Sequence, residues 1–221
     1  MKLLLVENEG YSSYGSGEDL HLKKIGWGIT GAGHLLIESV EVMSELASQP
    51  GIELTTFLSK AGFECAQMYG VLEKIGEIST HVYDDTRASA PEVGGLARGR
   101  YKVLVISPAT ANTIAKIVSG IADTLVTNAV AQAQKAKTPV ILVPTDQAFG
   151  PILTKLPYKM KKEAGQSLST SSEIKYGEEI QIAIRRVDAD NFEKLKKMEG
   201  MKVLGHPYKI LDTIKSYLDQ T

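Results

Sequence analysis

Two nearly uninterrupted apolar runs constrain the fold of this chain more than any other feature. Residues 101–107 and 140–143 are short, rich in Val, Ile and Leu, and followed by Pro within a few residues. Such runs are typical of strands buried on both faces, which occur where helices cover both sides of a parallel sheet. The sequence therefore predicts a fold of the α/β class.

Strand and helix patterns alternate from Lys23 onwards. The helical pattern is clear over residues 34–48, where apolar side chains recur every three or four positions and glutamates occupy the opposite side. The other predicted helices are 61–75, 113–119, 122–137, 190–198 and 209–218, and the other predicted strands are 25–30, 52–59, 78–83, 180–187 and 202–204. This order predicts a three-layer, Rossmann- or flavodoxin-like parallel sheet with helices on both faces.

The same alternation predicts a single domain over residues 23–221. Residues 1–22 are an N-terminal extension that is rich in Gly, Ser and acid and is either disordered or, through residues 1–6, an edge strand. Residues 147–178 lack periodicity and are long for a plain connection, so we interpret them as a lid, an interface arm or a mobile loop.

Composition excludes several functional classes. The 221 residues include 25 Lys+Arg and 26 Asp+Glu, and the net charge of −1 gives no reason to expect nucleic-acid binding. The single cysteine, Cys65, excludes an internal disulfide, a Cys-rich zinc site and an iron–sulfur cluster held by this chain alone, and we predict no metal site. No apolar run approaches the ~20 residues of a membrane span. We therefore expect a cytoplasmic protein without a membrane partner.

The carboxyl ends of the predicted strands are the expected ligand site. The first of them, residues 30–33, contains Gly31 and Gly33, which let the backbone approach a phosphate in front of a helix. Ser59 and Thr110 offer hydroxyl donors to the same anion. The alternative is that the two glycines only permit a tight turn from strand to helix.

The literal G-x-G-x-x-G match at Gly26, Gly28 and Gly31 does not indicate a nicotinamide site. Its first two glycines lie inside a predicted strand rather than after it. The second strand ends in Ser59, where a nicotinamide-binding domain has an acidic residue for the ribose.

A second candidate ligand loop spans residues 107–113, with the sequence SPATANT. Its small residues let a planar ligand lie against the backbone, Asn112 can donate and accept hydrogen bonds at a ring edge, and Thr113 can cap the next helix. The alternative is a capping turn without a ligand.

Residues 107–113 resemble the PASANT motif of the homo-oligomeric flavin-containing Cys decarboxylase superfamily. The similarity continues through residues 114–125 and, with residues 28–32, covers about residues 23–146. The resemblance implies FMN, with its phosphate at the first loop and Ser59 and its ring near residues 107–113, in trimers with flavin sites between subunits. The cofactor-binding residues that it implies are Thr30, Gly31, Ala32, Gly33, Ser59, Ser107, Ala109, Thr110, Asn112 and Thr113.

The catalytic residues of the decarboxylase branch are missing. Gly94 stands where its histidine is expected, and no histidine lies between His81 and His206. The substrate-clamp pattern of that branch keeps only Pro144. Because oxidative decarboxylation needs a base, a flavin-dependent decarboxylase is a disfavoured alternative, as is a flavin prenyltransferase.

Residues 27–36, 185–188 and 200–204 resemble archaeoflavoproteins and the acceptor-type dihydromethanopterin reductases. This resemblance implies an FMN-dependent oxidoreductase that reduces dihydromethanopterin, or a related dihydropterin, with electrons from an external donor. Such chemistry demands few side chains because the flavin carries the hydride. The alternative is an FMN electron-transfer protein that accepts electrons from ferredoxin and has no substrate of its own.

Two side chains are candidates for contact with the substrate or the flavin. Asp146 either hydrogen-bonds a pterin or the flavin or is a solvated carboxylate at a strand end, and His34 either meets the ligand or is an ordinary residue at a helix start. The lysines within residues 155–162 either receive an acidic donor such as ferredoxin or belong to a solvated loop. Tyr158 in that loop is a candidate cover for the flavin.

Overall fold

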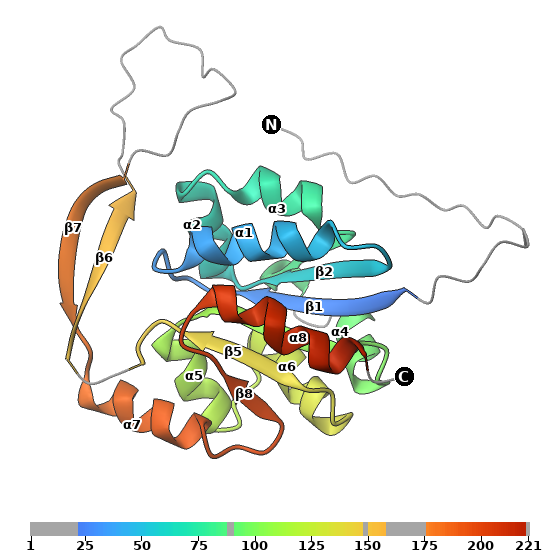
Figure 1. Cartoon of the computed structure of the whole chain (residues 1–221). Coiled ribbons are helices and arrows are strands. Elements are labelled where there is room, and N and C mark those ends of the chain that lie inside the picture. Colours follow the sequence, from blue (N-terminus) through green and yellow to red (C-terminus); the bar gives the residue numbers. More distant parts are fainter. Residues whose placement is uncertain (1–21, 88–90, 148–149, 158–175, 220–221) are drawn as a thin grey trace, which may run out of the picture.

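A six-stranded parallel sheet forms the centre of the molecule (Figure 1). The computed structural model describes residues 22–87, 91–147, 150–157 and 176–219. In spatial order the strands are β3 (His81–Asp84), β2 (Ile52–Leu58), β1 (Lys23–Ile29), β4 (Val103–Ala109), β5 (Val140–Pro144) and β8 (Met201–Val203). The order and the parallel pairing confirm the predicted Rossmann-like fold class.

Helices cover both faces of this sheet, which confirms the three layers. One face packs against α1 (Leu36–Ala47), α2 (Lys60–Met68), α3 (Leu72–Ile78) and α8 (Ile210–Leu218). The other face packs against α4 (Pro91–Ala97), α5 (Ala111–Val118), α6 (Leu125–Lys135) and α7 (Arg186–Leu195). Two short 3₁₀ turns, η1 (Asp85–Arg87) and η2 (Pro207–Lys209), complete the elements outside the strands. No helix in these described ranges is long and apolar enough to cross a bilayer.

Strand β1 shows how the two cores divide the sequence. Ile25, Trp27 and Ile29 point into the core beneath α1. On the opposite face, an added Cβ would lie 2.8 Å from Leu104 Cδ1 at Gly26 and 2.6 Å from Ile106 Cδ1 at Gly28. The two glycines therefore make room for neighbouring side chains of β4, which explains why the G-x-G-x-x-G match lies inside a strand.

Several predicted boundaries are wrong for reasons visible in the caps. The helix predicted over 61–75 is two helices, α2 and α3, because the chain reverses at Gly70 with φ +69°. The strand predicted to end at residue 107 continues to Ala109. Thr110, rather than Thr113, caps α5, since its side chain accepts a hydrogen bond from the Thr113 N–H. Helix α6 starts only at Leu125 because Thr124 forms a capping box with Thr127.

The segment predicted as an aperiodic loop contains regular structure. Strands β6 (Pro151–Pro157) and β7 (Tyr176–Ala183) pair antiparallel and stand beside the main body, and we call them the arm (Figure 1). The strand predicted over 180–187 exists as β7, but its boundaries are wrong, because β7 begins at Tyr176 and α7 begins at Arg186. The sequence gives little sign of β6, since the two strands of the arm pair with each other instead of lying in the buried sheet.

Some predictions fall outside the described residues. These are the N-terminal extension up to residue 21, with its candidate edge strand, and residues 158–175, with Tyr158 and most of the lysine cluster. The division into an extension and a single domain stays a prediction.

Candidate functional site

The candidate site lies where β1 and β4 end side by side. The chain leaves β1 towards β2 on one side and β4 towards β5 on the other, so the crevice between them is the topological switch point at which such folds bind ligands. The Thr30 hydroxyl donates to the Pro108 carbonyl at 2.8 Å and accepts from the Thr110 N–H at 2.9 Å. These two bonds hold both ligand loops together.

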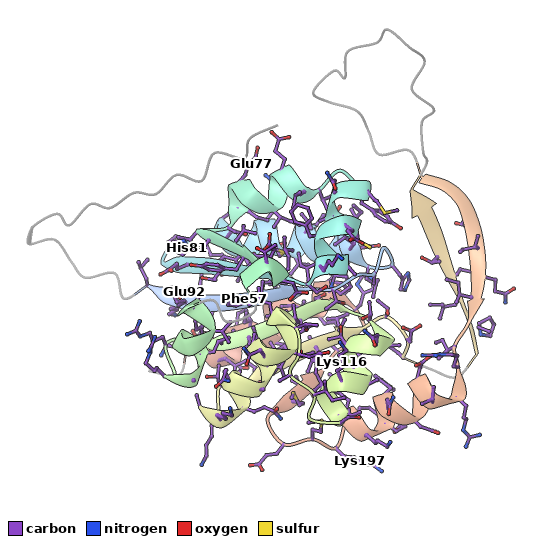
Figure 2. The ribbon with its side chains drawn as sticks, turned by 180° about the vertical axis from the view of Figure 1, so that it is seen from behind. Phe57, Glu77, His81, Glu92, Lys116 and Lys197 are labelled. Atoms are coloured by element: carbon purple, nitrogen blue, oxygen red, sulfur yellow. The ribbon has the colours of Figure 1, made fainter. Side chains whose placement is uncertain are left out.

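A cavity of about 440 Å³ opens beside these loops at the beginnings of α2 and α5; we call it the helix cavity. Its lining residues are Gly31, Ser59, Lys60, Ala61, Glu64, Asp85, Thr110, Asn112, Thr113, Lys116 and Thr124. Two lysines and two acids offset one another, and Lys116 (Figure 2) is also paired with Asp123 at 2.9 Å. The net charge of the lining therefore does not select an anion, and backbone donors have to do so.

Backbone N–H groups supply that selectivity. Among the described residues, the N–H groups of Gly31, Ala61 and Asn112 have no hydrogen-bond acceptor, and all three residues line the helix cavity. Ser59 and Thr110 stand at the N-caps of α2 and α5, where their side chains accept from backbone N–H groups. Free N–H groups and hydroxyls at helix N-termini are suited to a phosphate, so the residues present fit FMN.

Asp85 is a residue that the sequence reasoning missed. Its carboxylate accepts from the N–H groups of Lys60 and Leu125, each at 2.6 Å, and thus lies at the N-termini of α2 and α6. The helix dipoles stabilise a negative group there, and because Asp85 itself uses the N–H groups of Lys60 and Leu125, these two donors are not available to a ligand. The signal was its position directly after β3, at the same carboxyl edge of the sheet.

The glycines of the first loop serve protein packing. An added Cβ at Gly31 would lie 2.4 Å from Ala61 Cβ, and one at Gly33 would lie 1.8 Å from Tyr69 Oη. The two glycines therefore make room for α2 and for Tyr69, a role that neither interpretation of the sequence included. The Gly31 N–H group has no acceptor among the described residues and is therefore available to a ligand.

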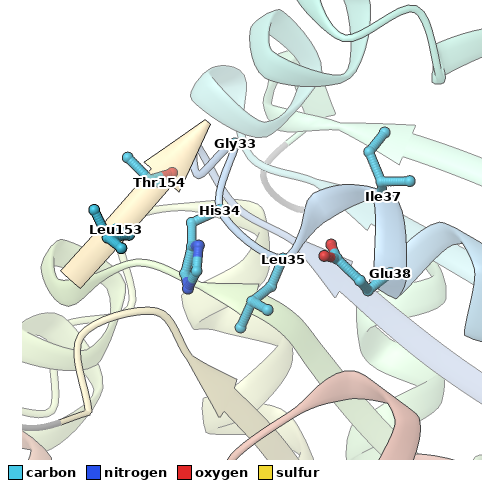
Figure 3. A pocket seen from close by; sticks show the side chains of 7 residues that line it. All are labelled: Gly33, His34, Leu35, Ile37, Glu38, Leu153 and Thr154. Atoms are coloured by element: carbon cyan, nitrogen blue, oxygen red, sulfur yellow. The ribbon is translucent and has the colours of Figure 1, made fainter. Parts of the chain in front are cut away.

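A second cavity, of about 330 Å³, adjoins the first and shares Gly31, Thr110 and Asn112 with it; we call it the arm cavity. The rest of its lining is Ala32, Gly33, His34, Tyr69, Ala111, Thr145, Asp146, Ile152, Thr154 and Ile182. The last three belong to the arm and meet residues of α5 and of the loops that follow β1 and β5 at one opening. His34 also faces a smaller cavity of about 260 Å³ between α1 and β6 (Figure 3).

The lining of the arm cavity contains one imidazole, that of His34, and one carboxylate, that of Asp146. Burial lowers the pKa of His34, while the carboxylates of Glu38 and Asp146 oppose this shift and His206 adds to it. Asp146 accepts a hydrogen bond from the Thr145 hydroxyl at 2.8 Å through Oδ2. Its other oxygen, Oδ1, has no partner among the described residues.

Comparison with known proteins identifies the family. Residues 13–219 match the family model described as Flavoprotein. This chain belongs to the flavoprotein family. The dihydromethanopterin reductase (acceptor) of Methanocaldococcus jannaschii is 37% identical over 86% of this flavoprotein and 94% of that protein. The reductase of the same name from Methanosarcina mazei is 33% identical over 87% of this flavoprotein and 99% of that protein.

A solved structure agrees with both. Burkholderia xenovorans DmrB in complex with FMN, described as a cubic protein cage for redox transfer, superposes on this flavoprotein with a TM-score of 0.69. The two are 30% identical, and the match covers 89% of this chain and 96% of DmrB. The predicted resemblance to the reductase branch is thereby confirmed.

The flavoprotein brings most of its sequence-predicted site residues together. Gly31, Ser59, Thr110, Asn112 and Thr113 line the helix cavity, and Ala32, Gly33, His34 and Asp146 line the arm cavity. Thr30, Ser107 and Ala109 line neither cavity and are buried. The Ser107 hydroxyl instead bonds the Ser39 hydroxyl at 2.8 Å, so these three residues support the loops from behind.

Proposed function

We propose that this flavoprotein is an FMN-dependent oxidoreductase that reduces dihydromethanopterin, or a related dihydropterin, with electrons from an external donor. The observation that carries the proposal is the pair of adjoining cavities, one rich in hydrogen-bond donors to a phosphate and one lined in part by the arm. The identity to two dihydromethanopterin reductases over nearly their whole lengths supports the same reaction.

The two cavities suggest how FMN is held. The backbone N–H groups of Gly31 and Asn112 and the hydroxyls of Ser59, Thr110 and Thr113 bind the phosphate in the helix cavity. The small residues of the first loop leave space for the ring beside the arm cavity, within reach of the Asn112 side chain. When bound, the flavin supplies hydride or single-electron transfer, and the protein supplies position and electrostatics. The chain's own task is to orient the ligands and exclude water from the arm cavity.

An FMN electron carrier without a substrate is the second candidate. The description of DmrB as a cage for redox transfer favours it, because that wording names no substrate. A decarboxylase is the least supported alternative. Gly94, at the position of the expected histidine, lies on α4, and α4 contributes no described residue to the helix cavity or the arm cavity.

We also propose a homo-oligomer built from trimers, with flavin sites between subunits. The cage described for DmrB supports assembly of a related chain, and the arm exposes Leu153 at 66% of its surface. We propose further that an acidic, ferredoxin-type donor docks near the lysines within residues 155–162. Light scattering tests the assembly, and a salt dependence of the reduction rate tests the docking.

Anaerobic turnover tests the reaction itself. The FMN-loaded protein is photoreduced and mixed with dihydromethanopterin. We expect the oxidised flavin absorbance to return in step with formation of the tetrahydro product. A protein that stays reduced with the pterin, yet is reoxidised rapidly by oxidised ferredoxin, is the electron carrier instead.

A further inference from the structure

The proposed flavin contacts leave two titratable side chains of the arm cavity without a role. His34 lies between the end of β1 and α1, and Asp146 follows β5. Both line the same opening, to which the arm contributes Ile152 and Ile182 from its two paired strands. A proton donor and a carboxylate thus face a cavity whose remaining walls are largely small or apolar.

His34 stands where a proton can be exchanged with a bound molecule. Figure 3 shows its imidazole directed away from α1 into the space next to Leu153 and Thr154 of β6. The charged or titratable groups that act on it are Glu38 on α1, Asp146 after β5 and His206 before η2. Burial is the largest effect and, with His206, favours the neutral ring, whereas the two carboxylates favour the imidazolium, so the pKa of His34 is lowered on balance.

Asp146 has the chemistry to recognise one edge of a pterin. The Thr145 hydroxyl donates to one lone pair of Oδ2, which leaves Oδ1 and the second lone pair of Oδ2 for a ligand. The 2-amino group and the neighbouring ring N–H of an aminopyrimidinone form two parallel donors, and a carboxylate accepts such a pair in the bidentate manner that it accepts from arginine. A flavin ring has no such amino group, so this contact distinguishes the substrate from the cofactor.

The geometry points to Asp146 as the residue that binds the aminopyrimidinone edge of a dihydropterin, and to His34 as the donor that protonates the substrate nitrogen. This inference rests on the proposed function. The C=N bond of the dihydropterin is reduced: its carbon would gain a hydride from the reduced flavin, which would thereby be oxidised by two electrons, and its nitrogen gains a proton from the His34 imidazolium. The neutral imidazole then takes a proton from solvent.

The first test replaces His34 with Asn, which keeps a polar side chain but cannot donate a proton of this kind. We expect the rate of dihydropterin reduction to fall at least about 100-fold. We also expect the pH–rate profile to lose the limb on which the rate of the wild type falls as an acid of the enzyme is deprotonated. FMN affinity and reoxidation by ferricyanide, which takes electrons without a substrate proton, stay unchanged. The matched control is His81→Asn, on exposed strand β3 far from the arm (Figure 2).

The second test measures binding without turnover. Asp146→Asn in the oxidised, FMN-loaded protein weakens the binding of dihydropterin by about 10- to 100-fold, as followed by flavin fluorescence. Asp212→Asn, on the exposed surface of α8, is the control. Equal binding by wild type and Asp146→Asn overturns the role of Asp146.

The outcomes separate the inference from the function on which it rests. Wild-type turnover with an unchanged rate and pH profile in His34→Asn overturns the role of His34 and leaves the reductase intact. No turnover in wild type, despite normal reoxidation by ferricyanide, overturns the reductase and the proton-donor role together. The binding titration still decides the role of Asp146 in that case.

Discussion

The helix cavity and the arm cavity share three residues but are built in opposite ways. In the helix cavity the polar groups are fixed by the fold, since Ser59 and Thr110 cap helices and Asp85 joins two helix N-termini. In the arm cavity His34 forms no hydrogen bond with any described residue, and Asp146 has one oxygen free. This difference agrees with the proposed roles: the helix cavity is a preorganised cofactor site, and the arm cavity is a substrate site whose polar groups form hydrogen bonds when a ligand binds.

The largest effect is expected at Gly31, which lines both cavities. In Gly31→Ala the new Cβ meets Ala61 Cβ at 2.4 Å, so α2 has to shift away from the first loop. We expect a loss of stability of about 1–3 kcal/mol, the usual cost of overpacking, and FMN binding weakened at least about 10-fold. Urea unfolding of the apoprotein and an FMN titration measure the two effects.

Gly76→Ala is the matched control for this change. Gly76 lies in α3 with open space around its Cβ position, so alanine there is neutral or gains up to about 1 kcal/mol of helix propensity. If both alanines destabilise equally, the contact with Ala61 is not the cause.

The second prediction separates the cavities by ligand. Ser59→Ala removes the N-cap of α2, where the side chain accepts from the Gly62 N–H at 3.0 Å, and costs about 1 kcal/mol of stability. It also weakens FMN binding about 10-fold and leaves riboflavin binding unchanged, because only FMN carries a phosphate. An equal loss for both flavins contradicts a phosphate at Ser59. Ser48→Ala, at the exposed end of α1, is the control.

These two positions also show what the sequence could predict. The apolar runs of β4 and β5 identify the buried parallel strands, and chain order then brings residues 30–33 and 107–113 to one edge without any knowledge of side-chain contacts. Most of the candidate site follows from that placement. Ser59 was found in the same way, as a hydroxyl at a strand end.

Contacts distant in the sequence could not be predicted. Gly33 suggests approach to a phosphate, but Tyr69 occupies the space beside it, and only the packing of α2 reveals this. Ser107 suggests a ligand contact, but it bonds Ser39 from an adjacent helix. Strand β6 was missed because its partner β7 is distant in the sequence, so that Ile152 and Ile182 pair across a long connection rather than within one periodic segment.

The third prediction concerns Asn112, which both cavities share. Its side chain is exposed and forms no hydrogen bond with a described residue, so Asn112→Ala changes stability by less than about 0.5 kcal/mol. We expect a few-fold weaker affinity for FMN and for riboflavin alike, or a shifted flavin potential, since this side chain can contact the ring edge. An unchanged dissociation constant, spectrum and potential would contradict that placement of the ring.

The smallest expected effect is a pH dependence of stability that arises from the arm cavity alone. Burial lowers the pKa of His34 from its ordinary value of 6.5, so the unfolded chain binds this proton more readily than the folded chain. The stability contribution is therefore complete above pH 6.5 and is lost as the pH falls below it. Urea unfolding of the apoprotein at pH 7.5, 6.5 and 5.5 should show a shallower decline in the free energy of unfolding for His34→Asn than for wild type.

The control variant His81→Asn should lose stability more steeply than His34→Asn as the pH falls, because it keeps the half-buried imidazole of His34. Parallel curves for wild type and His34→Asn would mean that the imidazole is as free to take a proton in the folded cavity as in water. The arm would then not shield it, and the contrast between the two cavities would lie in hydrogen bonding alone.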